Sequence, residues 1–161
     1  MKNKLLSYLE NDANITPAQL SALLDKEVGD IKKMILDCEK EGVILGYKTI
    51  IDWDKTDRDY VTAIIEVKTT PQPERGFDRI AEKIYNYPEV ESLYLVSGAF
   101  DFAIIIEGKT LREVALFVAQ KLSPIEHITA TSTLFVLRKY KDKGLIYGAA
   151  PIKDEREFTC E

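Results

Sequence analysis

The sequence predicts an α+β fold made of two consecutive units. Three stretches with apolar residues at helical spacing occupy the first third of the chain, and from residue 60 onward the apolar residues alternate as they do in strands. Between these patterns lies a short stretch that is dense in charge and poor in apolar side chains, as expected of a linker. We therefore expect a first unit over residues 1–52, a linker over 53–59, a second unit over 60–140 and a C-terminal extension over 141–161.

The first unit is expected to hold three helices followed by a small wing. Lys2 to Glu10 carries leucines at helical spacing, and Thr16-Pro17-Ala18-Gln19 has the composition of a capping box that opens a second helix. A third helix begins near Val28 and ends at Gly42. Residues 25–27 have about the length of the turn in a helix-turn-helix, and the β-prone pieces hinged at Gly46 predict a wing of two short strands.

A winged helix-turn-helix is typical of DNA-reading modules, whose second recognition helix enters the major groove. The residues expected to contact DNA lie at the start and on the exposed face of the third helix: Lys26, Gly29, Asp30, Lys32 and Lys33. The charge balance is unfavourable, because residues 1–52 hold seven lysines, no arginine and nine acidic residues. The competing interpretation is a helical bundle or dimerisation cap that binds no nucleic acid.

The second unit is expected to follow the order βαββαβ. Strands are predicted from Tyr60 until Pro71 and Pro73 break the pattern, and over residues 90–97, 102–107 and 128–138; the helices are predicted from Phe77 and from the capping box Thr110-Leu111-Arg112-Glu113. This order is the ferredoxin-like arrangement, whose two helices cover one face of the sheet. Because the last two strands are apolar on both faces, the uncovered face needs a partner. A second copy of the same sheet would make a two-fold homodimer.

Composition excludes several classes of protein. The chain has 161 residues and a net charge of −5, with no run of 18 apolar residues and no secretory signal pattern, so a cytoplasmic protein without a membrane span is expected. Cys38 and Cys160 lack metal-ligand spacing, so neither a metal site nor a cofactor is expected. His127 is the only histidine, and no catalytic triad or Gly-rich phosphate loop accompanies it. An enzyme is therefore not expected.

Three motifs, in this order, add a resemblance to a known family. Cys38-Glu39 leads into Gly42-Val43-Ile44-x-Gly46-Tyr47, the turn Ser97-Gly98-Ala99-Phe100-Asp101 joins the second and third strands, and Thr129-x-Thr131-x-Thr133 precedes Phe135-Val136-Leu137. Together with the domain order, they resemble the Lrp/AsnC (feast/famine) family of bacterial and archaeal regulators over roughly Leu5 to Lys139. Where members of this family usually show arginine on the third helix, this chain has Met34, Leu36 and Asp37.

The resemblance implies a transcription regulator that dimerises through the C-terminal sheet, often assembles into octamers, and binds a small effector, usually an amino acid, near the Gly-x-x-Asp turn. The implied effector-binding residues are Ser97, Gly98, Ala99, Phe100, Asp101 and Thr131. Backbone N–H groups of a glycine turn suit the carboxylate of an amino acid, and Asp101 suits its ammonium. The competing interpretation is that Gly98 only makes the turn and Asp101 bonds its own turn's backbone.

Two other functions compete with a DNA-binding, effector-responsive regulator. The acidic third helix favours an effector-sensing oligomeric module with little DNA affinity, acting through protein contacts. An enzyme is the remaining hypothesis, because related two-domain folds act as tetrapyrrole decarboxylases, but Asp101 has no identifiable acid–base partner. In the extension, Gly144 to Gly148 is expected to add an edge strand, and Pro151 to Glu161 is charged and expected to be mobile.

Overall fold

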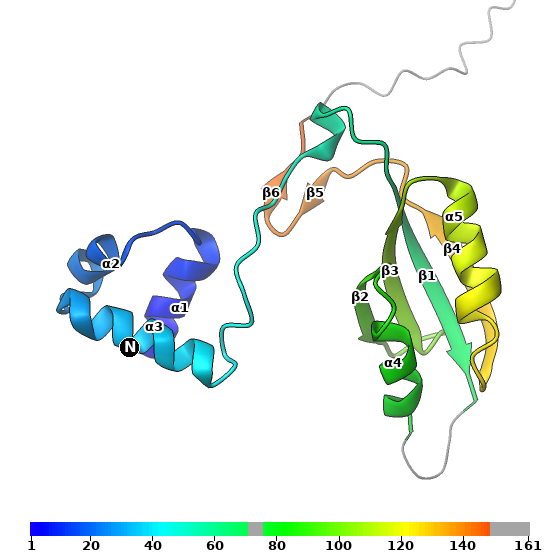
Figure 1. The fold of residues 1–161 in the computed structure, drawn as a ribbon, viewed down its shortest axis with the longest axis horizontal. Helices are drawn as coiled ribbons and strands as arrows, with labels where there is room; N and C mark the ends of the chain where they lie inside the picture. The colour runs from blue at the N-terminus through cyan, green and yellow to red at the C-terminus, as the bar shows by residue number, and fades with distance from the viewer. Residues whose placement is uncertain (71–75, 149–161) are drawn as a thin grey trace, which may run out of the picture. The chain divides into compact units, whose positions relative to one another are not determined.

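The computed structural model describes residues 1–70 and 76–148 (Figure 1). It divides into two compact units, Met1–Ile51 and the chain from Asp52 onward. The division lies one residue before the end of the first unit expected from the sequence.

The first unit consists of three helices, α1 (Lys2–Asn11), α2 (Pro17–Leu24) and α3 (Val28–Lys40). Each helix contributes at least one leucine or isoleucine to a common core, because its apolar residues recur on one face. The buried members are Leu5, Leu9, Leu20 and Ile31, with Ile15, Leu24, Met34, Ile35 and Ile44 packed against them.

The entry into α2 and the turn into α3 are fixed by local hydrogen bonds. Gln19 N–H donates to Thr16 Oγ1 at 3.3 Å, and Thr16 N–H donates to Gln19 Oε1 at 2.8 Å, so the expected capping box is formed. Asp25 ends α2 in the left-handed conformation with φ of 51°, and the hydroxyl of Ser21 donates to the carbonyl of Lys26. These contacts set the direction in which α3 leaves the turn.

The expected wing does not form strands, and that prediction is wrong for this structure. Gly42 adopts φ of 68°, and the N–H groups of Val43 and Ile44 both donate to the carbonyl of Cys38, at 2.9 and 3.1 Å. These N–H groups therefore cap the end of α3 and are not available to a β-ladder. No strand is found in residues 43–52, and Leu45 is 95% exposed.

The second unit contains a four-stranded antiparallel sheet and two helices in the order βαββαβ, as predicted. The elements are β1 (Val61–Thr69), α4 (Asp78–Tyr85), β2 (Val90–Leu95), β3 (Phe102–Gly108), α5 (Leu111–Phe117), a π-helical turn η2 (Val118–Leu122) and β4 (Ile128–Phe135). The strands lie side by side in the order β2-β3-β1-β4. The sequence-adjacent strands β1 and β2 are thus separated by β3, as in a ferredoxin-like fold.

Both α4 and α5 cover the same face of this sheet (Figure 1). The core between them takes alternate residues of the central strands, since successive side chains of a strand point to opposite faces. Its buried members are Ala63, Ile65, Val67, Ile80, Ile84, Phe102, Ile104, Ile106, Val114, Phe117, Leu122 and Ile125. Ile104 is fully buried, whereas its neighbour Ile105 on the other face is only partly covered.

The other face, which we call the open face, has an apolar centre. Ile64 of β1 pairs with Ile105 of β3 on one side and with Leu134 of β4 on the other, and paired residues share a face. Leu134 is 50% exposed and Tyr94 of β2, paired with Ala103, is 55% exposed. The register thus places Ile105, Ile64 and Leu134 side by side on the face that no helix covers, whereas the β2 residue that pairs with Ile105 is Ser92.

Two sheet boundaries differ from those expected. β2 ends at Leu95 and β4 at Phe135, each before its predicted limit. Val136 N–H still donates to the carbonyl of Thr62 at 2.9 Å, but β1 begins at Val61 and offers β4 no further partner. The β1–β4 ladder therefore stops near the first residue of β1.

The segment from Gly144 to Gly148 does not add an edge strand to the sheet, so that prediction is wrong. β6 (Leu145–Ile146) pairs with β5 (Lys141–Asp142) in a separate hairpin. Lys143 and Gly144 have φ of 47° and 84°, and two left-handed central residues define a tight hairpin turn of type I′. This turn pairs the segment with its immediate neighbour. The predicted strand breakers Pro71 and Pro73, Cys160, and the tail from Pro151 to Glu161 lie outside the described residues.

The predicted linker is held against the second unit at its C-terminal end. It begins with a 3₁₀ turn, η1 (Trp53–Lys55), and the guanidinium of Arg58 lies 4.4 Å from the centre of the Trp53 ring. Arg58 also forms an ion pair with Glu107 of β3, with 3.6 Å between Nη2 and the carboxylate. The Tyr60 hydroxyl donates to Asp54 at 2.9 Å, and burial together with this bond raises the pKa of Tyr60 to about 12.

Candidate functional site

The turn between β2 and β3 is short and exposes its backbone. Val96 N–H donates to the carbonyl of Asp101 at 2.8 Å, which closes the turn, and Ser97, Gly98 and Ala99 are exposed between them. Phe100 is half-buried. Among the described residues, no acceptor takes the backbone N–H groups of residues 97–100. The turn therefore presents a run of donors, as an anion-binding turn does.

Asp101 braces the end of β1. Its Oδ2 accepts hydrogen bonds from Thr69 N–H at 2.7 Å and from Thr69 Oγ1 at 3.1 Å, and its own N–H donates to the carbonyl of Val67 at 2.9 Å. The carboxylate thus bonds the neighbouring strand, whereas the competing sequence interpretation placed the bond within its own turn. Oδ1 accepts no hydrogen bond from the described residues. One carboxylate oxygen is structural, and the other is available to a ligand.

Thr131 lies at the same end of the sheet as Asp101 but across β1. It pairs with Val67 of β1, to whose carbonyl Asp101 donates from the other side. Two strand spacings separate β3 from β4, which amounts to about 10 Å. Because the charged groups of an amino acid are only a few ångströms apart, Thr131 and Asp101 of one chain do not converge on the same group of such a ligand.

Sequence reasoning missed two residues near the turn. Thr69 holds Asp101, although 32 positions separate them in sequence, and no local pattern signals such a contact. Lys68 lies beside Thr69 at the exposed end of β1, and it forms no ion pair within the described ranges. Only the strand order of a ferredoxin-like sheet, in which β3 lies next to β1, could have predicted that Thr69 and Lys68 lie near the turn.

The expected DNA-contacting residues all lie on the surface of the first unit. Lys26 is in the turn before α3, and Gly29, Asp30, Lys32 and Lys33 are exposed along α3, whose buried side carries Ile31 and Cys38. Neither Lys32 nor Lys33 forms an ion pair in the part of the chain that the structure describes. Their ammonium groups are therefore free to meet phosphates.

Other lysines of this unit are less available. Lys2 forms an ion pair with Glu41, and the hydrogen bond to Glu41 raises the pKa of the Lys2 ammonium. Leu36 is 47% exposed on α3 between Lys32 and Lys40. The positive surface of α3 is thus narrow, as the charge count predicts.

Metal chemistry and membrane insertion find no support in residues 1–70 and 76–148. No group of three or more His, Cys, Asp or Glu side chains there could hold a metal ion. No described helix combines the length and the apolar character needed to cross a bilayer.

The structure thus combines a three-helix unit with a ferredoxin-like unit that carries a donor-rich turn. Comparison with known proteins gives the family. Residues 62–146 match the model of the Lrp/AsnC ligand binding domain. The chain belongs to the Lrp/AsnC family of DNA-binding transcriptional regulators.

Relatives cover nearly the whole chain. It is 39% identical over 147 residues to the uncharacterised HTH-type transcriptional regulator YugG of Bacillus subtilis, covering 91% of this chain and 89% of that protein. It is 25% identical over 142 residues to a proline dehydrogenase transcriptional activator of Rhizobium radiobacter, covering 88% and 90%. The structure of the Neisseria meningitidis transcriptional regulator NMB0573 in complex with L-Met shares the fold, with a TM-score of 0.70, 18% identity and coverage of 88% and 90%.

These comparisons bear on the functional alternatives. The family and the named relatives are transcription regulators, which supports a regulatory role over an enzymatic one. The assignments of individual residues to DNA or effector contacts stay predictions.

Proposed function

We propose that this protein is a cytoplasmic transcription regulator that binds double-stranded DNA as a homodimer and responds to an amino acid bound at the turn between β2 and β3. The observation that carries the effector site is the juxtaposition of unpaired backbone donors at residues 97–100 with the unoccupied Oδ1 of Asp101. The donors suit a carboxylate and the aspartate suits an ammonium. The L-Met complex of the structural relative supports this class of ligand.

In the proposed site, the ammonium of Lys68 attracts the carboxylate of the ligand. It is exposed next to Thr69, to which Asp101 is bonded, so a cation and an anion stand at the same end of the sheet. Thr131 is too far across β1 to share a ligand with Asp101 of the same chain. We propose that Thr131 contributes through a second chain, in an assembly of dimers such as the octamer that the family resemblance implies.

The open face of the sheet supports the dimer. Ile64, Ile105 and Leu134 form an apolar centre that no described element covers, and a large exposed apolar patch marks an interaction surface. In a two-fold interface the same surface patch of both chains meets. The open faces of two identical sheets can pack together in this way. The narrow basic surface of α3 makes the dimer important for function, because two copies double the number of phosphate contacts.

A thermal-shift screen against the twenty amino acids is expected to find at least one that stabilises the native protein, because ligand binding to the native state raises its stability. Gly98→Val should abolish that shift while leaving the unliganded melting temperature nearly unchanged. A Cβ at Gly98 would meet no heavy atom within 4 Å, and φ is not left-handed there, so the fold tolerates a side chain that blocks the turn's donors. A shift equal to wild type in Gly98→Val would place the site elsewhere.

DNA binding is expected to be weak and sharply salt-dependent. Each neutralised phosphate contributes roughly −0.9 to the log-log slope of affinity against salt, so Lys33→Ala should flatten that slope by about one unit for each chain engaged. Lys109→Ala, which removes an equal charge from the second unit, is the matched control and should leave the slope unchanged. Fluorescence anisotropy at several salt concentrations measures both. Tight binding insensitive to salt would contradict the assignment of α3.

The second candidate function is an effector-sensing oligomeric module that has little DNA affinity and acts through protein contacts. The acidic residues Asp30, Asp37 and Glu39 on the exposed side of α3 favour it, because they repel phosphates. Retention on a heparin column at low salt supports DNA binding, and elution in the void volume supports the sensor.

A further inference from the structure

The hairpin formed by β5 and β6 concentrates positive charge in a chain that is otherwise acidic. Residues 138–147 hold four basic residues, Arg138, Lys139, Lys141 and Lys143, against the single acidic residue Asp142. No other stretch of ten residues in the sequence has such an excess of basic residues, and residues 1–52, which contain α3, hold seven lysines against nine acidic residues. The hairpin is therefore the segment of this chain that most strongly attracts a polyanion.

Two lysines of the hairpin keep their charge available. The ammonium of Lys139 is engaged inside the hairpin, because it lies 3.8 Å from the Asp142 carboxylate and 5.2 Å from the centre of the Tyr147 ring. Lys141 and Lys143 are exposed, and neither forms an ion pair within residues 1–70 and 76–148. Their ammonium groups can therefore meet phosphates without first breaking a bond inside the protein.

Lys143 stands at a backbone position that the turn itself does not favour for lysine. It is the first central residue of the type I′ turn, with φ of 47°, and Gly144 is the second, with φ of 84°. Such a turn prefers asparagine, aspartate or glycine at the first position, because these residues tolerate the left-handed region better than a long side chain does. Turn stability therefore does not explain the lysine, whereas a contact made by its charge at the exposed tip does.

The hairpin lies beside the segment of chain that connects the two units. A Cβ on Gly148, just after β6, would lie 3.2 Å from the ammonium nitrogen of Lys55. Lys55 is the last residue of η1, which closely follows the boundary between the units after Ile51. Lys55 is itself paired with Asp52 at 3.1 Å. The unpaired lysines of the hairpin are thus joined through a short stretch of chain to the unit that carries α3.

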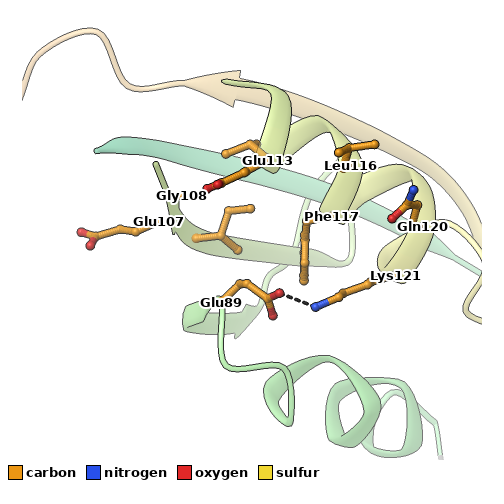
Figure 2. Close-up of a pocket in the computed structure, with 10 residues that line it drawn as sticks. Glu89, Glu107, Gly108, Glu113, Leu116, Phe117, Gln120 and Lys121 are labelled. Atoms are coloured by element: carbon orange, nitrogen blue, oxygen red, sulfur yellow. Dashed lines mark hydrogen bonds and ion pairs between the residues drawn. The ribbon is translucent and has the colours of Figure 1, made fainter. Parts of the chain in front are cut away.

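A different part of the second unit, the hollow between β3 and α5, is unsuited to DNA. Figure 2 shows Glu89, Glu107 and Glu113 around this hollow, with Lys121 as the one lysine that lines it. Lys121 is paired with Glu89, and Glu107 is paired with Arg58, which leaves Glu113 without a cation among the described residues. This surface offers a phosphate an unpaired carboxylate and no unpaired lysine, so it repels DNA where the hairpin attracts it.

We propose that the hairpin of β5 and β6 is a second DNA contact of this regulator, in which Lys141 and Lys143 bind backbone phosphates of the duplex that α3 contacts. The partner is double-stranded DNA because the chain belongs to a family of DNA-binding regulators and because α3 has few unpaired cations of its own. Phosphate contacts carry no sequence information, so the hairpin raises the affinity for every duplex alike. This inference rests on the DNA binding proposed above and extends it beyond α3.

A double variant, Lys141→Gln with Lys143→Asn, removes both charges and keeps the hairpin, because Asn-Gly is a preferred type I′ pair. In fluorescence anisotropy with a random-sequence duplex, it should flatten the log-log salt slope of the full chain by about two units for each chain engaged. Lys83→Gln with Lys109→Gln removes two exposed charges elsewhere in the second unit and should keep the wild-type slope. An unchanged slope in the hairpin variant, or equal flattening in the control, would overturn the inference.

Protection of lysines from acetylation separates this contact from that of α3. The full chain is treated with acetic anhydride with and without the duplex, and mass spectrometry measures acetylation at each lysine. DNA should protect Lys141 and Lys143 and leave Lys83 as reactive as before. Protection of Lys32 and Lys33 alone would overturn the inference while the assignment of α3 stands. Protection of the hairpin alone would support the inference and contradict that assignment, and protection of neither would contradict both.

Discussion

Ile105→Glu is expected to convert a dimeric protein into a folded monomer. Ile105 lies on the open face beside Ile64, which separates it from Leu134, so a carboxylate there would have to be buried in the proposed interface. In an interface an unpaired charge costs several kcal/mol, whereas in a monomer it faces water and costs little. Light scattering reports the mass, and circular dichroism shows whether the fold is retained.

The neighbouring residue gives the matched control. Ile104 points to the core side of the same strand and is fully buried. Ile104→Glu should therefore prevent folding altogether, since a buried carboxylate in an apolar core has no partner. If Ile105→Glu stayed dimeric, or if the wild-type chain were a monomer at micromolar concentration, the open face would not be the interface.

Asp101→Ala is expected to have the second-largest effect, a loss of about 2–3 kcal/mol of folding free energy together with loss of the effector response. The substitution removes the acceptor of both Thr69 hydrogen bonds and leaves the buried Thr69 groups unpaired. Urea denaturation with and without the amino acid found in the thermal-shift screen measures both effects.

Asp101→Asn separates the structural role of this residue from its binding role. The amide oxygen can still accept from Thr69, so most of the stability should return, but the group no longer carries the charge that attracts an ammonium. Calorimetry on this variant should show strongly reduced amino-acid affinity. Unchanged affinity in a well-folded Asp101→Asn variant would mean that Asp101 has only a structural role.

Much of the fold could be predicted because its signals are local. Helical spacing of leucines, the capping box at Thr16 and alternation in β1 each depend on residues close in sequence, and the structure forms all of them. At Thr110 only half of the predicted capping box forms, because the carboxylate of Glu113 accepts from the N–H of Lys109 and not from that of Thr110. The predicted wing strands do not form where the N–H groups of Val43 and Ile44 cap the end of α3. The prediction of an added edge strand was wrong because Lys143 and Gly144, both in the left-handed conformation, close a local hairpin.

The candidate site could be predicted only in part. The sequence places a glycine and an aspartate in one turn, but the partner of Asp101 is Thr69 on a strand that is distant in sequence and adjacent only through the sheet order. The separation of Thr131 from Asp101 by β1 likewise follows from strand order.

Selection of genomic DNA fragments by the purified protein, followed by anisotropy on the enriched duplex, tests the central claim most directly. A regulator of this kind should enrich particular fragments, bind them more tightly than random duplex, and change that affinity when its stabilising amino acid is added. The log-log salt slope should correspond to contacts from both chains of a dimer. No enrichment over random duplex, with binding indifferent to every amino acid, would contradict the account and favour a sensor that acts through protein contacts.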